Sequence, residues 1–177
     1  MTSTGYFSEA TVELTWALIH ATIRDVAAES SSVRAGGWQR SVGADLAGQV
    51  LGVLGLGNIG RIVADRARGL GMKVIAHDPY LSEKQIPNLD VELVSFDALL
   101  ERSDAITIHV PRTKDTANLF GRAAFAKMRP GVLLVNAARG GIVDEAALGE
   151  AIRSGKVGGA ALDVYSEEPP PASAELS

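Results

Sequence analysis

The chain has 177 residues, of which 46% are hydrophobic and 21% charged, with a formal net charge of −4. This composition suits one soluble globular domain with a core of its own. The acidic balance and the absence of a basic cluster argue against a nucleic-acid partner. Without cysteine the chain has no disulfide or thiolate metal site, and its three scattered histidines lack metal-ligand spacing, so we expect no metal. No apolar run approaches the length of a membrane span and no signal-peptide pattern opens the chain, which favours a cytoplasmic protein without membrane contact.

The N-terminal part is expected to form a helix and a connector. Residues 8–29 combine a polar start with an apolar stripe, which predicts one long amphipathic helix. This helix precedes the nucleotide fold, so we expect it to pack on a partner domain or subunit. Residues 30–48 are polar and glycine-bearing. Trp38, their one large apolar side chain, is expected to fill a gap against the sheet or at a subunit interface.

Residues 49–78 carry the motif around which the chain is organised. An apolar strand at Val50–Leu54 leads into a glycine turn, a helical segment and a second apolar strand that ends in Asp78. In a dinucleotide site Gly55 permits the turn, Gly57 lets the backbone approach the pyrophosphate, and Gly60 lets the helix lie close to the sheet. Asp78 would accept the ribose hydroxyls of the adenosine half and repel a 2′-phosphate, which predicts NAD. The alternative is an ordinary glycine-rich turn with a surface aspartate.

The rest of the chain alternates short apolar runs with helical segments. We predict strands at residues 72–76, 91–94, 105–110, 132–137 and 158–164, and helices at 95–102, 120–128 and 144–153, the first capped by Ser95. Near-continuous apolar strands between helices predict an α/β fold, a doubly wound parallel sheet with helices on both faces and an N-terminal lead-in helix. The expected division is a lead-in of residues 1–48, a Rossmann core of 49–168 and the start of a C-terminal segment at 169–177.

Polar residues follow the predicted strands at the points where those strands end. They are Asn58, Asp78, His109, Arg139, Asp163 and Glu168. In a parallel sheet of this kind the ligand lies beyond the carboxyl ends of the strands, at the point where strand order reverses. Residues far apart in the chain are therefore expected to converge on one crevice.

Each of these side chains has a chemical and a plain structural interpretation. Arg139 suits bidentate binding of a substrate carboxylate, or it caps a helix or pairs with Asp144. Asp163 ends an apolar strand, so we expect it to be partly buried and to need a donor, either the nicotinamide carboxamide or a backbone amide. Glu168 could raise the pKa of a catalytic histidine, or be a solvated acid. His109 could donate a proton, or be a hydrogen-bonded structural residue.

The sequence also resembles a known family. Five segments carry the resemblance: GLGNIGR, AHDPY, ITIHVPRTKDTANLF, LLVNAARGGIVDEAAL and GAALDVYSEEPP. Together they resemble the nucleotide-binding domain of the D-2-hydroxyacid dehydrogenases, with a phosphoglycerate dehydrogenase-like appearance, over residues 5–171. The resemblance implies a cofactor-binding set of Gly55, Gly57, Asn58, Ile59, Gly60, Asp78, His109, Val110, Pro111, Ala137, Ala138, Arg139 and Asp163.

The same resemblance implies a reaction. It points to an oxidoreductase acting on a CH–OH group, which transfers hydride between a D-2-hydroxy acid and NAD. Arg139 would be the catalytic arginine that binds the substrate carboxylate and carbonyl, and Asp163 would contact the nicotinamide. Glu168 would pair with the catalytic histidine. In the family that histidine follows the Glu-Glu-Pro motif, and this chain stops at Ser177 without it, so we expect the isolated chain to bind NAD without turnover.

Family resemblance further implies a homodimer formed through the nucleotide-binding domain. The apolar stripe of residues 8–29 and Trp38 are the candidates for that surface. A competing hypothesis is an NAD-sensing binding module, like the transcriptional corepressors of this family. The presence of Arg139 and Glu168 favours an enzyme, because sensing requires neither.

Overall fold

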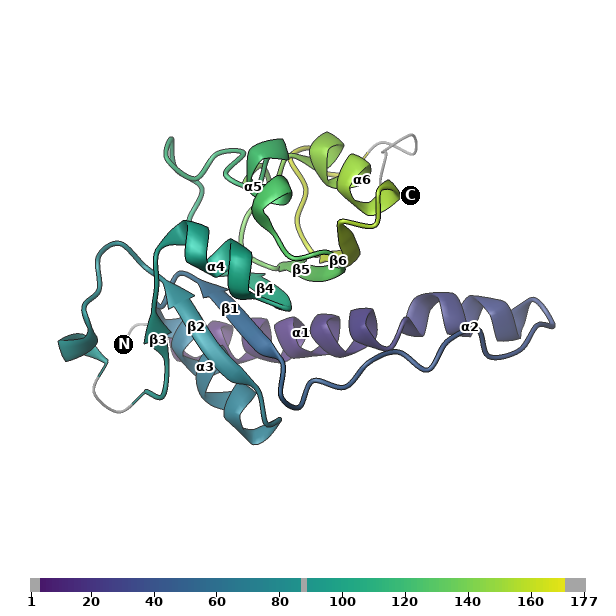
Figure 1. The fold of residues 1–177 in the computed structure, drawn as a ribbon, viewed down its shortest axis with the longest axis horizontal. Helices are drawn as coiled ribbons and strands as arrows, with labels where there is room; N and C mark the ends of the chain where they lie inside the picture. Colours follow the sequence, from purple (N-terminus) through teal and green to yellow (C-terminus); the bar gives the residue numbers. More distant parts are fainter. Residues whose placement is uncertain (1–3, 87–88, 171–177) are drawn as a thin grey trace.

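Six parallel strands form one sheet (Figure 1) in a computed structural model that describes residues 4–86 and 89–170. The strands are β1 Val50–Leu54, β2 Lys73–His77, β3 Glu92–Leu93, β4 Ala105–Ile108, β5 Val132–Asn136 and β6 Val157–Leu162. The helices are α1 Thr4–Ile23, α2 Val26–Arg34, α3 Asn58–Gly69, α4 Phe96–Arg102, α5 Arg122–Lys127 and α6 Glu145–Arg153, with a short 3-10 helix, η1, at Glu83–Gln85.

The order of strands across the sheet is β3-β2-β1-β4-β5-β6. β1 pairs in parallel with β2 on one side and with β4 on the other. Strands β2 and β3 are therefore added on one side of β1, and β4, β5 and β6 are added in turn on its other side. This reversal makes the junction of β1 and β4 the topological switch point, where ligands bind in such sheets. The predicted doubly wound parallel sheet is confirmed.

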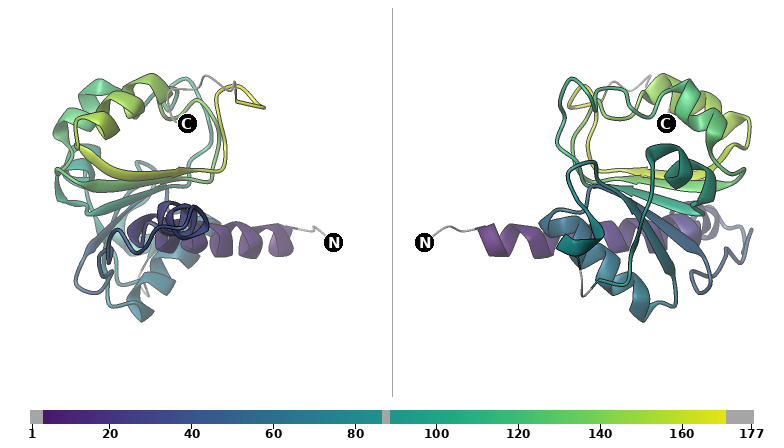
Figure 2. Two further views of the ribbon diagram at one scale, coloured as in Figure 1. Left: turned by 90° about the vertical axis from the view of Figure 1, so that its right-hand side faces the viewer. Right: turned by 60° about the vertical axis from the view of Figure 1, so that its left-hand side comes forward.

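Helices cover both faces of the sheet, and each face has its own apolar core (Figure 2). Successive side chains of a strand point to opposite faces. Leu51 and Val53 of β1 accordingly pack with α1 and α3, whereas Leu54 packs in the core formed by α4, α5 and α6. Strands that are buried on both faces read as continuous apolar runs, which is why the sequence revealed them.

The predicted long helix at residues 8–29 is wrong in its bounds. The chain instead breaks between α1 and α2, where Asp25 has a φ of 51°. A left-handed residue interrupts the helical hydrogen-bond ladder, and aspartate tolerates this conformation better than most residues. The Arg24 guanidinium fixes the break by donating to the carbonyl oxygen of Val42 at 3.0 Å and to the Asp45 carboxylate at 2.8 Å.

The other predicted elements are present, with bounds that differ by at most two residues at each end. The Ser95 hydroxyl caps α4 by accepting a hydrogen bond from the Ala98 amide at 3.1 Å, as predicted. The predicted strand at 105–110 ends earlier, at Ile108. The residues that follow it therefore belong to the loop at the sheet's carboxyl edge.

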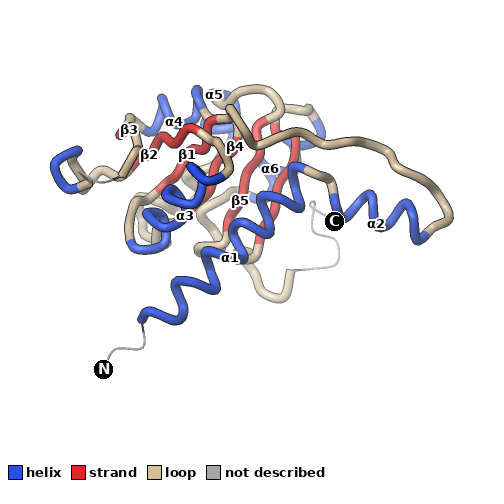
Figure 3. Tube along the Cα trace, turned by 90° about the horizontal axis from the view of Figure 1, so that it is seen from below, coloured by secondary structure: helices blue, strands red, loops and turns tan. Residues whose placement is uncertain are grey.

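The second helix, α2, and residues 35–48 form an arm that extends away from the sheet (Figures 1 and 3). Within the arm the Glu29 carboxylate accepts the amides of Arg40 and Ser41, and the Arg40 hydrogen bond contributes most to holding the pKa of Glu29 below its ordinary value. Trp38 is 81% exposed, so it fills no gap against the sheet.

The apolar stripe of α1 is part of the domain's own core. Its buried side chains are Val12, Trp16, Ile19 and Ile23. They share that core with residues of α3, β1 and β2. These four side chains are therefore covered within the chain and offer no surface to a partner. Four of the exposed large apolar side chains lie on the arm, and the others among the described residues are Leu14 of α1, Tyr80 and Ile152.

Candidate functional site

The turn between β1 and α3 depends on three glycines in three different ways. Gly55 has a φ of +88°, and a Cβ there would lie 2.7 Å from Val110 Cγ1 and 2.8 Å from the His109 carbonyl oxygen. A Cβ on Gly60 would collide with the carbonyl oxygen of Gly55. A Cβ on Gly57 would meet nothing within 4 Å. Two glycines thus shape the turn, and the third faces open space that a ligand can approach.

The start of α3 has no side-chain cap within residues 4–86 and 89–170. Gly57 occupies the N-cap position, and no described side chain accepts a hydrogen bond from the first amides, which include those of Asn58 and Ile59. The Arg61 guanidinium holds the turn in place by donating to the Leu56 carbonyl at 2.9 Å. Unpaired amides and the positive end of the helix dipole together form an anion-binding site.

Asp78 stands directly beside this turn, at the tip of β2. Its Oδ2 accepts the Leu56 amide at 2.9 Å, and its Oδ1 accepts the Tyr80 amide at 3.0 Å. The carbonyl oxygen of His77 accepts the Gly55 amide at 2.9 Å, which joins the turn to β2. Each carboxylate oxygen has a further lone pair, so Asp78 can also accept two hydroxyl groups from a ligand.

His109 follows β4 on the other side of the turn. Its amide donates to the Leu54 carbonyl at 2.7 Å, and its Nε2 lies 2.9 Å from the hydroxyl of buried Thr107. Burial lowers the pKa of His109 to about 4. The imidazole is therefore neutral at pH 7 and engaged by a core threonine, which fits its interpretation as a structural residue rather than a proton donor. Val110 and Pro111 continue along the same edge.

Asn136 organises the next loop and was missed by the sequence reasoning. Its side chain is 1% exposed. The Nδ2 group donates to the Arg139 carbonyl at 3.0 Å, Oδ1 accepts the Ala138 amide at 3.1 Å, and the backbone oxygen accepts the Asp163 amide at 3.0 Å. An asparagine at the end of an apolar strand must satisfy its amide locally, and that demand was the available signal.

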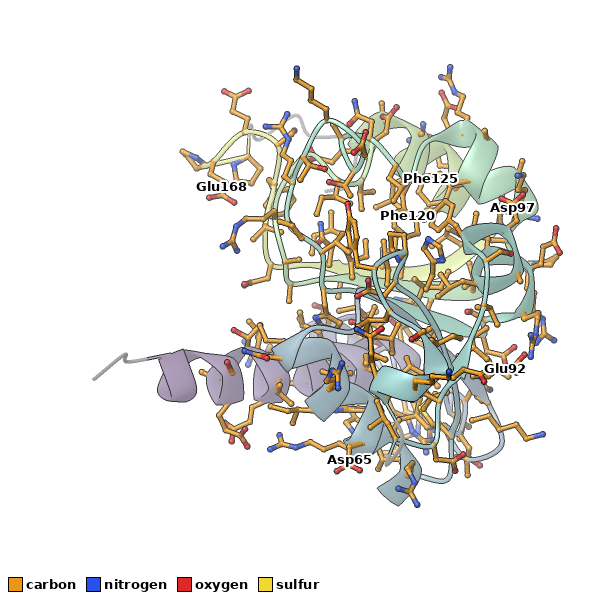
Figure 4. The ribbon with its side chains drawn as sticks, turned by 90° about the vertical axis from the view of Figure 1, so that its left-hand side faces the viewer. Asp65, Glu92, Asp97, Phe120, Phe125 and Glu168 are labelled. Carbon is orange, nitrogen blue, oxygen red and sulfur yellow. The ribbon has the colours of Figure 1, made fainter. Side chains whose placement is uncertain are left out.

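Arg139 and Glu168 lie on the same small hollow beyond β4, β5 and β6. Its volume is about 480 Å³, and it is lined by Arg112, Ala138, Arg139, Gly140, Val164, Tyr165, Ser166 and Glu168. A Cβ on Gly140 would collide with the Tyr165 carbonyl, so this glycine allows the two loops to touch. Figure 4 shows Glu168 on the outer loop after β6. Of the six side chains predicted to converge on one crevice, Arg139 and Glu168 line this hollow, whereas Asn58, Asp78, His109 and Asp163 do not.

The two side chains have different local partners. Arg139 Nη1 donates to the Ala138 carbonyl at 2.6 Å, and Glu168 Oε1 accepts the Tyr165 amide at 3.0 Å. Asp144 caps α6 through the Ala147 amide at 3.1 Å, and within residues 4–86 and 89–170 it forms no salt bridge with Arg139. The alternative of an Arg139–Asp144 pair is therefore not observed.

Asp163 differs from the expectation. Its side chain is exposed rather than partly buried. The reason is its position one residue beyond β6, which is the edge strand of the sheet. Its amide donates to the Asn136 carbonyl at 3.0 Å, and its carboxylate has no hydrogen bond within residues 4–86 and 89–170.

In the described part of the chain no group of three or more histidine, aspartate or glutamate residues is placed to hold a metal ion. Nor is any of its helices both long and apolar enough to cross a membrane.

The parallel sheet, the glycine turn at the switch point and the acid at the tip of β2 define a dinucleotide-binding domain of the Rossmann type. The family model described as "D-isomer specific 2-hydroxyacid dehydrogenase, NAD binding domain" matches residues 16–177. The chain belongs to that family, as the NAD-binding domain, and its cofactor is NAD.

Relatives and solved structures agree with this assignment. The chain is 52% identical over 163 residues to a D-3-phosphoglycerate dehydrogenase of Archaeoglobus fulgidus, covering 91% of this chain and 31% of that protein. A glyoxylate reductase from Paecilomyes thermophila has a TM-score of 0.88 and 38% identity, over 95% of this chain and 52% of that one. A D-lactate dehydrogenase from Aquifex aeolicus, complexed with NAD and lactic acid, has a TM-score of 0.85 and 33% identity, over 93% and 50%. The chain thus spans about three tenths of the length of its curated relatives.

Proposed function

We propose that this chain holds NAD along the carboxyl edge of its sheet for hydride transfer to and from a D-2-hydroxy acid. The observation that carries the proposal is the shared hollow of Arg139 and Glu168 on the same edge as the glycine turn. A cofactor site alone requires neither side chain. Together they supply a carboxylate-binding cation and an acid able to pair with a histidine.

The residues along the edge suit the successive parts of the cofactor. Asp78 accepts the hydroxyls of the adenosine ribose, and the open space at Gly57 admits the pyrophosphate against the amides of Asn58 and Ile59. The nicotinamide half then lies over the loops that follow β4, β5 and β6. The residues proposed to line that half are Val110, Pro111, Ala137, Ala138 and Asp163.

The bound cofactor supplies the acceptor for the hydride. Arg139 holds the substrate carboxylate and stabilises negative charge that develops on the carbonyl oxygen. Glu168 is proposed to pair with a histidine that exchanges the hydroxyl proton and to keep that histidine basic. His109 does not suit this role because it is neutral and bonded to Thr107. We therefore expect the chain alone to bind NAD without turnover.

Calorimetric titration of the chain with NAD and NADP tests the cofactor half of the proposal. We expect NAD to bind at least about tenfold more tightly, because the charge of Asp78 repels a 2′-phosphate. A preference for NADP would contradict the role of Asp78. Assays with NAD and D-glycerate, D-lactate or 3-phospho-D-glycerate test the second half, and substantial turnover would show that another group moves the proton.

We also propose that two copies of the chain associate through the arm. Val26, Val33, Trp38 and Val42 are 51%, 56%, 81% and 75% exposed, and all four lie on this projecting element. A protein rarely exposes so many large apolar side chains on one segment unless a partner covers them. The candidate partner is the same segment of a second copy, since isologous dimers are the commonest assemblies.

Sedimentation of the Trp38→Ser variant tests this association. We expect wild type to sediment as a dimer and Trp38→Ser to dissociate at protein concentrations at least about tenfold higher, because a buried indole contributes more than 1 kcal/mol to an interface. Tyr80→Ser is the matched control, since Tyr80 is 86% exposed but lies in the turn after β2, outside the arm. A monomeric wild type, or equal effects of the two changes, would contradict the proposal.

A further inference from the structure

A second arginine faces the hollow that contains Arg139. Arg112 lies on the loop that follows β4 and lines the same hollow of about 480 Å³. Its guanidinium lies over Gly141, where an added Cβ would be 2.8 Å from Arg112 Nε and 3.2 Å from its Cζ. Gly141 also has a φ of +71°, so this position suits glycine on two counts. The Arg-Gly-Gly turn therefore presents Arg139 and makes room for Arg112.

The charges around the hollow are not balanced by the protein. Within residues 4–86 and 89–170 Arg112 has neither a hydrogen bond nor an ion pair, and Arg139 donates only to the carbonyl of Ala138. Glu168 is the one carboxylate among the lining residues, and it already accepts the Tyr165 amide. Two guanidinium groups against one carboxylate leave the hollow with an excess positive charge, which favours an anionic ligand.

One guanidinium matches one carboxylate or phosphate, because its planar fork binds two oxygens of the same group. If Arg139 holds the carboxylate of the 2-hydroxy acid, Arg112 remains available for a second anion. We infer that Arg112 is a specificity-determining residue that binds a second acidic group, phosphate or carboxylate, on the far end of the substrate. This inference rests on the proposed function, which assigns the first carboxylate to Arg139.

The plain alternative is that Arg112 is a solvated surface cation. Lys114 provides the matched comparison for that alternative. It lies on the same exposed loop and carries the same charge, but it does not line the hollow. Replacing either residue by glutamine removes one positive charge from the loop, so a general electrostatic effect would be the same for both variants. A direct contact would depend on Arg112 alone.

The test is calorimetry on the full chain saturated with NAD, with three acids as probes. 3-Phospho-D-glycerate carries a distal phosphate, D-malate a distal carboxylate, and D-glycerate neither. We expect either 3-phospho-D-glycerate or D-malate to bind about tenfold more tightly than D-glycerate, because one charge-assisted contact contributes that much affinity. The acid that binds more tightly identifies the distal group as phosphate or carboxylate. Arg112→Gln should reduce its affinity to within about twofold of D-glycerate, Arg112→Lys should restore part of it, and Lys114→Gln should leave it unchanged.

Several results would overturn the assignment of Arg112. They are equal binding of the three acids by wild type, no binding of any of them to the NAD-bound chain, and an unchanged preference in Arg112→Gln. An equal loss in Lys114→Gln would also overturn it, because the effect would then be general charge. All variants should bind NAD as wild type does, which shows that they are folded. Failure of wild type to bind NAD would instead contradict the proposed function, so the two failures are distinguishable.

Discussion

Replacing Asp78 by asparagine changes two interactions while keeping the shape of the side chain. In the wild type the Asp78 carboxylate accepts the Leu56 amide at 2.9 Å through one oxygen and the Tyr80 amide at 3.0 Å through the other. Asparagine has one oxygen, so only one of the two amides keeps its acceptor, and the new NH2 group faces the other donor. We expect this change to lower the free energy of unfolding by about 1–2 kcal/mol, since the lost bond was to a charged group.

The loss of cofactor affinity should be larger than the loss of stability. Two ribose hydroxyls that donate to a carboxylate contribute about 1.5 kcal/mol each, or about 3 kcal/mol together. The dissociation constant of NADH should therefore rise by about a hundredfold in Asp78→Asn. NADPH should lose less, because the same change removes the negative charge that repels its 2′-phosphate. The preference for NADH over NADPH should fall to about one.

Titration of the cofactors' fluorescence measures both dissociation constants, and urea unfolding measures the stability. Asp65→Asn is the matched control, since Asp65 lies in the C-terminal half of α3 and its one ion pair among the described residues is with Arg68 at 3.9 Å (Figure 4). It should bind NADH as wild type does. An Asp78→Asn variant with unchanged NADH affinity would refute the reasoning, because the ribose would then not depend on this carboxylate.

Three further predictions concern the glycine turn, His109 and Asn136. Gly57→Ala should keep the free energy of unfolding within about 1 kcal/mol of wild type but raise the NADH dissociation constant at least about tenfold. Gly60→Ala places a Cβ against the Gly55 carbonyl and should lower the free energy of unfolding, measured in urea, by about 2 kcal/mol or more. Because the pKa of His109 is about 4 when folded and about 6.5 when unfolded, the unfolded chain takes up the proton first. Stability should fall by up to about 3 kcal/mol as the pH drops from 6.5 to about 4, and His109→Gln, unfolded in urea at pH 7 and pH 4.5, should not show this loss. Asn136→Ala leaves the Ala138 amide and the Arg139 carbonyl without their partner and should cost about 2–3 kcal/mol in the same measurement, while an unchanged value would mean that water replaces the amide.

The sheet could be predicted from the sequence because its strands are covered on both faces. Runs such as Val132–Asn136 are apolar at almost every position, and only a strand between two layers of helices needs that pattern. The glycine spacing was informative for a different reason. At Gly55 and Gly60 a Cβ would collide with other protein atoms, so the fold itself requires glycine at these two positions.

Features that depend on which elements become neighbours could not be predicted. The apolar stripe of residues 8–29 continues across Asp25, so periodicity gave no sign of the break there. Asp163 was expected to be partly buried, but it follows the edge strand, and strand order does not follow from apolar periodicity. Arg112 faces Arg139 only because β4 and β5 are adjacent in the sheet.

The loops of the candidate site are fixed by hydrogen bonds that continue the ladders of the sheet. The Gly55 amide donates to the carbonyl of His77, the His109 amide to that of Leu54, and the Asp163 amide to that of Asn136. Each of these bonds joins the first loop residue of one strand to its neighbour, so the register of the strands also sets the positions of the loops. All three bonds join protein groups, so the sheet itself positions the loops that border the proposed NAD site. Cofactor affinity should therefore depend on the stability of this one sheet, which is why we expect this chain alone to retain it.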